Sequence, residues 1–205
     1  MNHSANHATC NASKSAIHWR KLLLAAAMLA LANCASDRPL TEDQRHALQQ
    51  PPASVAADVA RLQPGVANYI RQAEQAGLAR GRALTADESA LAVRVGVAHP
   101  ERVRVIVASA FPVPADPALT GELKSRFGID GKANGGLTMG HAIFVATKYA
   151  DARWLLAHEL THVGQFETLG VDQFAHDYLV QLIMVGYTRA PIEEAARMNE
   201  HLGRE

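Results

Sequence analysis

Apolar residues recur at helical spacing along the C-terminal part of the chain and predict three consecutive helices. The first runs from Asp151, its expected N-cap, to about Phe166, and its apolar positions are Trp154, Leu155, Leu156, Ala157, Leu160 and Val163. Gly170 is expected to end it, and a second apolar helix follows over Val171–Val185. Proline suits the first turn of a helix, so Pro191 is expected to open a third helix that reaches about His201.

Two short runs upstream predict strands. Arg102–Val107 alternates charged with β-branched residues, which is typical of a strand with one solvated face, and Ala142–Ala146 is wholly apolar. A loop with three prolines, Phe111–Pro117, lies between them. A helix from Thr85, its expected cap, to about Val95 precedes the first strand. These elements predict an α+β domain in which a small mixed or antiparallel sheet packs against the helix from Asp151 and the C-terminal helices.

The segment before this body is rich in Pro and Ala. It predicts a short helix over Thr41–Gln49, a break at Pro51-Pro52 and another helix over Val66–Gly77. Apolar residues here share one helical face, and they are Val55, Val59, Leu62, Val66 and Ile70. We therefore expect residues 35–80 to form a spacer with short helices that packs against a body of residues 81–205.

Residues 1–34 have the organisation of an export signal. Basic residues precede the apolar run Leu22–Leu31, which is too short to span a bilayer comfortably. The following Asn33 and Cys34 complete a sequence similar to the lipobox of bacterial lipoproteins, although Asn33 replaces the usual small residue. Cleavage by ordinary signal peptidase after Ala32 is one alternative, and an uncleaved segment retained as an anchor is the other. All three interpretations predict export to the periplasmic side of the cell envelope, and the first predicts a lipidated Cys34 that anchors the chain in the membrane.

Composition excludes some classes of function and of ligand. Lys plus Arg and Asp plus Glu each number 20, so the charge balance gives no reason to expect nucleic-acid binding. The two cysteines, Cys10 and Cys34, both precede the expected body. Thiolate ligands for zinc are therefore excluded within residues 81–205.

The helix from Asp151 carries the sequence His158-Glu159-Leu160-Thr161-His162. Two histidines four residues apart project from one face of a helix, so both imidazoles can reach one metal ion. Glu159 lies beside that position, where its carboxylate can take a proton from a bound water. Burying these groups without partners is costly, which argues against two incidental histidines. The motif predicts a zinc hydrolase, most simply one that cleaves peptide bonds.

A catalytic zinc site usually has three protein ligands and one open position, so a third ligand is needed downstream. The metzincin pattern is excluded because Gln165 and Thr168 stand where it has Gly and His. His176 is chemically acceptable but falls in an apolar helix. Glu193 and Glu194 begin the last helix and lie about 100° apart around it, so both cannot face one ion equally well. Acidic residues at this position also complement the helix dipole without any metal.

On these residues the chain resembles bacterial gluzincin-type zinc metallopeptidases with the motif HELxHVxQ, matched here by His158–Gln165. Their downstream Pro-x-Glu-x-x-Ala pattern is matched by Pro191–Ala196, and Gly136–Phe144 is similar to the strand before their active-site helix. The resemblance covers about Leu84–Arg197. It implies a zincin-like fold, Zn²⁺ as the cofactor, and as the metal ligands His158, His162 and Glu193.

Further roles are expected from this chemistry. Glu159 would act as general base and return the proton to the leaving amine. A donor to the oxyanion is expected among Tyr187, Arg189, His176 and His141. Asp172 or Asp177 would orient the histidines, and the strand Ala142–Ala146 would pair by its edge with an extended peptide.

The sequence therefore predicts a zinc-dependent hydrolase of the cell envelope, a peptidase acting on peptide or protein substrates. One alternative is a non-catalytic envelope lipoprotein whose metal site is structural or absent, and another is an amidase of similar zinc chemistry that acts on peptidoglycan. A structural zinc site usually has four protein ligands and needs no general base, so the presence of Glu159 favours the enzyme. The sequence leaves the oligomeric state and the cleavage preference open.

Overall fold

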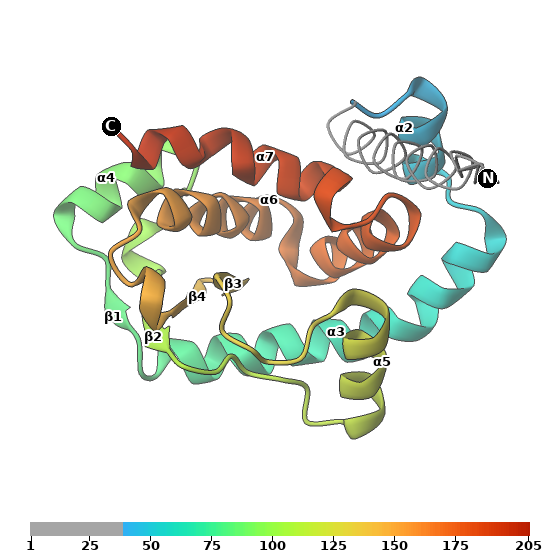
Figure 1. Ribbon diagram of the computed structural model, residues 1–205, viewed down its shortest axis with the longest axis horizontal. Coiled ribbons are helices and arrows are strands. Elements are labelled where there is room, and N and C mark those ends of the chain that lie inside the picture. The colour runs from blue at the N-terminus through green and yellow to red at the C-terminus, as the bar shows by residue number, and fades with distance from the viewer. Residues whose placement is uncertain (1–38) are drawn as a thin grey trace, which may run out of the picture. The chain divides into compact units, whose positions relative to one another are not determined.

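The computed structural model describes residues 39–205, and Leu40–Glu205 form one compact unit. The expected export signal and lipobox, residues 1–34, lie outside the described residues. The described part contains six α-helices and a mixed sheet of four strands (Figure 1). The predicted α+β class is thereby confirmed. None of the helices in residues 39–205 combines the length and the apolar character needed to cross a membrane.

The sheet has the strand order β1-β2-β4-β3. Its central pair, β2 (Arg104–Ala108) and β4 (Ala142–Ala146), is parallel, whereas β1 (Arg82–Ala83) and β3 (Gly136–Met139) add antiparallel strands at the two edges. Because β4 has a partner on both sides, the expectation that its edge receives a substrate is wrong. The edge strand on this side of the sheet is β3.

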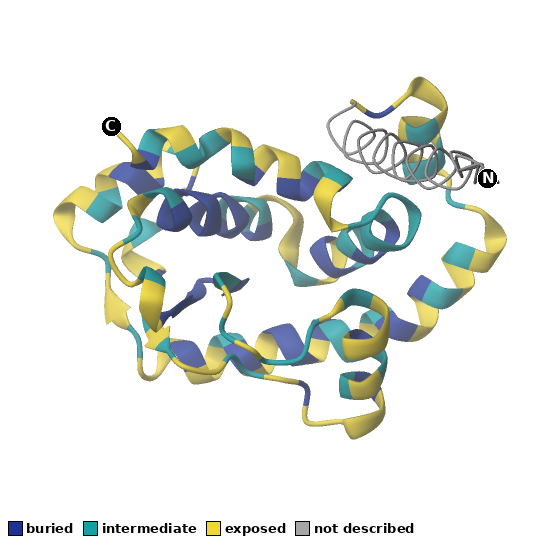
Figure 2. Cartoon of the chain, in the orientation of Figure 1, coloured by how far each residue is buried: buried dark blue, intermediate teal, exposed yellow. Residues whose placement is uncertain are grey.

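Alternate residues of β4 enter two different hydrophobic clusters, as the two-residue period of a strand requires. Ile143 and Val145 pack with α6 (Arg153–Met184) and α4 (Ala86–Arg94), whereas Ala142 and Phe144 pack with α3 (Ala53–Leu78). Helix α3 therefore covers one face of the sheet, and α6 and α4 cover the other (Figure 1). Every residue of β4 is buried, as is most of the first half of α6 (Figure 2).

Helix α6 consists of two helical halves joined at Gly170, whose φ of 73° and ψ of 165° are not helical. A φ in this range suits glycine, so the break expected at this residue is confirmed. The expected cap is wrong, because the helix begins at Arg153 after Ala152 and no side chain caps it. Helix α7 (Pro191–Asn199) starts at the expected proline and packs against α6.

The remaining helices lie in the first part of the described chain. Helices α2 (Glu42–Gln49) and α4 begin close to the expected positions with capping boxes, the latter formed by Thr85 and Glu88. Helix α3 begins 13 residues before the expected Val66 and continues through Pro64, because its long apolar face packs against the sheet and α6. Helix α5 (Pro117–Phe127), capped by Asp116, was not expected from the sequence.

Candidate metal centre

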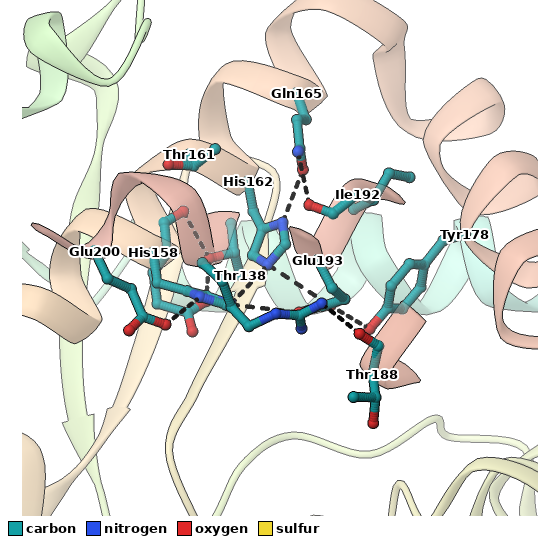
Figure 3. A network of polar contacts seen from close by, with 12 residues as sticks. Thr138, His158, Thr161, His162, Gln165, Tyr178, Thr188, Ile192, Glu193 and Glu200 are labelled. Atoms are coloured by element: carbon teal, nitrogen blue, oxygen red, sulfur yellow. Dashed lines mark hydrogen bonds and ion pairs between the residues drawn. The ribbon is translucent and has the colours of Figure 1, made fainter. Parts of the chain in front are cut away.

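Helices α6 and α7 bring together His158, His162 and Glu193. The two imidazole Nε2 atoms lie 3.2 Å apart. Glu193 Oε2 is 3.4 Å from His158 Nε2, and Glu193 Oε1 is 3.7 Å from His162 Nε2. All three residues are buried, and their side chains point toward one another (Figure 3). The group could therefore hold a metal ion, as the His-Glu-x-x-His spacing predicts.

Hydrogen bonds on the outer side of each imidazole direct the inner nitrogen toward this group. His158 Nδ1 lies 3.2 Å from Glu200 Oε1, and His162 Nδ1 lies 2.8 Å from Gln165 Oε1. The Gln165 amide donates its Nε2 hydrogen to Ile192 O at 3.0 Å, which fixes the amide oxygen toward the ring. Both Nδ1 atoms therefore carry hydrogen, and both Nε2 atoms present a lone pair.

The centre has the properties that a divalent cation requires. Two Nε2 lone pairs and the carboxylate of Glu193 converge, and Glu193 Oε2 is buried without a hydrogen-bond partner. Such an arrangement of acceptors is unfavourable unless a cation lies among them. Zinc bonds of about 2.0–2.1 Å in tetrahedral geometry place ligand atoms about 3.3 Å apart. The observed separations of 3.2, 3.4 and 3.7 Å are close to this value.

The structure distinguishes between the two carboxylates at the start of α7. Glu193 is 3% exposed and faces the imidazoles, whereas Glu194 is exposed to solvent. The Tyr178 hydroxyl donates to Glu193 Oε1 at 2.8 Å. Burial would raise the pKa of Glu193, but its contacts with His158, His162 and the Tyr178 hydroxyl lower that pKa to about 2. Glu193 therefore keeps its negative charge in this buried position.

Glu159 lies beside the centre and is 4% exposed. Burial raises the pKa of its carboxyl, while His162, His158 and a hydrogen bond from Thr138 oppose that rise. The Thr138 hydroxyl lies 2.6 Å from Glu159 Oε2, and Thr138 belongs to the edge strand β3. The Glu159 carboxylate thus lies beside the group of His158, His162 and Glu193, but it is hydrogen-bonded to Thr138.

An open cleft of about 810 Å³ reaches the centre. His158, Glu159, His162 and Glu193 all contribute to its wall. Its other walls are largely apolar and come from α3, α5, the loop before β3 and the second half of α6; they include Tyr69, Phe127, Ile129, Leu179 and Leu182. The cleft therefore connects the candidate metal group with solvent.

Among the four expected oxyanion donors, only Tyr187 lines the cleft in the described part of the chain. His141 is held between two carboxylates, with Nδ1 3.2 Å from Glu74 and Nε2 3.1 Å from Glu167. His176 pairs with its neighbour Asp177, and Arg189 donates to Gln44. These three residues have structural partners of their own away from the cleft wall.

The expected partners of the histidines are also different. Asp172 forms an ion pair with Arg71, and Asp177 accepts a hydrogen bond from Gln173. Glu200 and Gln165, instead of these aspartates, contact the outer nitrogens of His158 and His162. Gln165 could have been found from its place three residues after His162, where the two side chains share a helix face. Nothing in the sequence identifies Glu200, Tyr178 or Thr138.

Comparisons of the chain with protein-family models, with curated proteins and with solved structures found no match. The resemblance to gluzincin-type peptidases therefore depends on the motif and on the geometry of this centre. What the structure establishes is a buried group of two histidines and one glutamate on two packed helices.

Proposed function

We propose that this protein is a zinc-dependent hydrolase that cleaves peptide bonds, with a zincin-like arrangement of its metal centre. The observation that carries the proposal is the convergence of His158, His162 and Glu193 at the wall of an open cleft, next to the carboxylate of Glu159. Three protein ligands leave one position for water, and a structural zinc site usually has four. Access through the cleft and a neighbouring general base are both needed for catalysis and neither is needed for structural support.

A zinc ion at this centre supplies a Lewis acid and lowers the pKa of a water toward neutrality. Glu159 accepts the proton of the attacking water and delivers it to the leaving nitrogen of the substrate. Burial favours this role, because a carboxylate whose pKa is raised is a stronger base toward the proton of the water. Tyr187, which borders the cleft, would donate to the oxyanion that develops on the substrate carbonyl.

The shape of the cleft supports a peptide substrate. Gly136, Leu137, Thr138 and Met139 of the edge strand β3 all contribute to its wall. An extended peptide can add to such an edge through main-chain hydrogen bonds. The largely apolar walls further favour substrates with hydrophobic side chains near the cleaved bond.

We also propose that the protein is exported and held at the membrane through Cys34. Support comes from the basic and apolar segments before this residue and from their similarity to a lipoprotein signal. Cys34→Ala should move the exported protein from the membrane fraction to the soluble fraction. An unchanged distribution of the variant would contradict lipid anchoring.

The enzymatic proposal is tested by replacing Glu159 with Gln and assaying the zinc-loaded full chain on a mixed peptide pool. Hydrolysis should fall at least about 1,000-fold while one zinc per chain is retained, because the general base is lost and the ligands are not. Glu194→Gln, on the exposed side of α7, is the matched control and should keep its activity. A chelator should abolish hydrolysis, and added zinc should restore it.

Two outcomes would contradict the proposal. Hydrolysis that Glu159→Gln and the chelator leave intact would exclude the proposed chemistry. A zinc-loaded wild type that cleaves nothing in the pool, and whose zinc cannot be reached by small chelating ligands, would favour a structural role for the metal.

A further inference from the structure

Strand β3 makes two contacts with Glu159 that neither its pairing with β4 nor its place in the cleft wall requires. The Thr138 hydroxyl lies 2.6 Å from Glu159 Oε2 and 3.1 Å from the main-chain oxygen of the same residue. Both side chains are buried, with Thr138 8% and Glu159 4% exposed. The hydroxyl is thus committed to one residue of the motif helix rather than to its own strand.

Gly136 provides the second contact. A Cβ atom built on this residue would lie 2.2 Å from Glu159 Oε1 and 2.4 Å from Glu159 Cδ. Residues two apart on a strand share a face, so Gly136 and Thr138 both face α6. Gly136 is not among the described glycines with positive φ, so what this position requires is space and not an unusual backbone conformation. Any larger residue would displace the carboxylate.

The two contacts restrict the terminal torsion of the Glu159 side chain, which sets the orientation of its carboxylate. The carboxylate torsion of a glutamate is broad and has no sharp staggered minima, so it must be fixed from outside. Thr138 anchors Oε2, and the backbone of Gly136 lies against Oε1 and the carboxyl carbon.

We propose that Thr138 and Gly136 are positioning residues that fix the carboxylate of Glu159 for proton transfer. The edge strand that borders the cleft would thereby also orient the general base. This inference rests on the proposed function, in which Glu159 takes the proton of the attacking water. It extends that function by assigning a positioning role to two residues of the cleft wall that are not among the proposed metal ligands.

Thr138→Val and Thr138→Ser separate orientation from packing. Valine has the shape of threonine but places a methyl group where the hydroxyl oxygen now lies 2.6 Å from Oε2. A carbon approaches oxygen only to about 3.3 Å, so the carboxylate must move by about 0.5 Å or more. Misplacement of a catalytic group on this scale can cost up to about 100-fold in rate.

The kinetic test compares kcat, KM and bound zinc in the zinc-loaded full chain. We expect Thr138→Val to lower kcat 10- to 100-fold with KM and zinc content within about twofold of wild type. Thr138→Ser should restore kcat to within about threefold. Thr168→Val, which removes a hydroxyl bonded to Gly164 O on the exposed part of the same helix, is the control and should match wild type. Equal kcat for the valine and serine variants would overturn the proposal.

A second measurement does not depend on activity. In crystal structures, the Glu159 carboxylate should keep its orientation in Thr138→Ser and turn or shift in Thr138→Val and in Gly136→Ala. An unmoved carboxylate in both of the latter variants would overturn the positioning role. An inactive wild type would instead overturn the proposed function, and the crystal comparison would still decide whether β3 orients Glu159.

Discussion

Replacing Gln165 tests how a hydrogen bond to the outer nitrogen of His162 supports the candidate metal centre. Its amide oxygen lies 2.8 Å from His162 Nδ1, and its amide nitrogen donates to Ile192 O at 3.0 Å. One side chain therefore sets the tautomer of a ligand and links α6 to the helix that carries Glu193. Gln165→Leu removes both interactions while keeping a side chain of similar size.

The size of the effect follows from these contacts. Loss of an outer partner of a ligating histidine typically lowers metal affinity 10- to 100-fold, which corresponds to about 1.4–2.7 kcal/mol. Two partly buried hydrogen bonds are lost as well, so the metal-free protein should lose about 2 kcal/mol of unfolding free energy. We expect zinc affinity and stability to fall together in Gln165→Leu.

Gln181→Leu separates the tautomer from the link between helices. Gln181 accepts a hydrogen bond from Ile192 N at 2.9 Å, so it also connects α6 to α7, but it contacts no imidazole. This control should lose about 1 kcal/mol of stability and keep its zinc affinity within about threefold. Zinc affinity is measured by competition with a chromophoric chelator, and stability by urea unfolding of the metal-free protein. Equal losses of zinc affinity in the two variants would refute the tautomer argument.

Two further predictions concern other polar contacts of the core. Tyr178→Phe removes the hydroxyl that donates to Glu193 Oε1 and should weaken zinc binding about tenfold in the same competition assay, whereas an unchanged affinity would show that this bond does not support the ligand. His141→Gln should destabilise the protein by about 3 kcal/mol at pH 5.5, because it leaves two partly buried carboxylates without their cation. The pKa of His141 is raised, mainly by its hydrogen bond to Glu74 and further by its hydrogen bond to Glu167. Burial and the charge of Arg102 oppose this rise. The pKa of His141 is thus higher in the folded than in the unfolded state. The contribution of protonated His141 to the free energy of unfolding is therefore complete below about pH 6.5, and it is lost as the pH rises through the raised pKa of the folded state. Glu74 and Glu167 have lowered pKa values and stay charged in that range. Urea unfolding at pH 5.5 and pH 9 should therefore show a smaller difference in unfolding free energy between wild type and His141→Gln at the higher pH. A difference that grows with pH would contradict a stabilising charge on His141.

Local patterns predicted the elements that carry the metal centre. The uninterrupted apolar spacing around His158 identified the motif helix, and Gly170 identified its break. Pro191 marked the start of α7, and the match to the Pro-x-Glu-x-x-Ala pattern selected Glu193. Each of these signals lies within a few residues of sequence, where helix geometry determines which side chains share a face.

Contacts that depend on tertiary packing could not be predicted in this way. Glu200 reaches His158 only because the chain after α6 folds back along it, and Thr138 reaches Glu159 only because β3 lies at the sheet edge beside α6. The five apolar residues of Ala142–Ala146 did contain a usable signal, since a continuous apolar run is typical of an interior strand. Helix α5 escaped prediction because its apolar residues are few and Gly121 lies within it.

We propose that His158, His162 and Glu193 bind one zinc ion at the wall of the cleft. Diffraction data collected at the zinc absorption edge from zinc-loaded crystals test this binding most directly. We predict one anomalous peak within about 2.2 Å of both Nε2 atoms and a Glu193 oxygen, with solvent on the cleft side, and its loss in Glu193→Gln but not in Glu194→Gln. A peak elsewhere, or one that survives Glu193→Gln unchanged, would contradict the account.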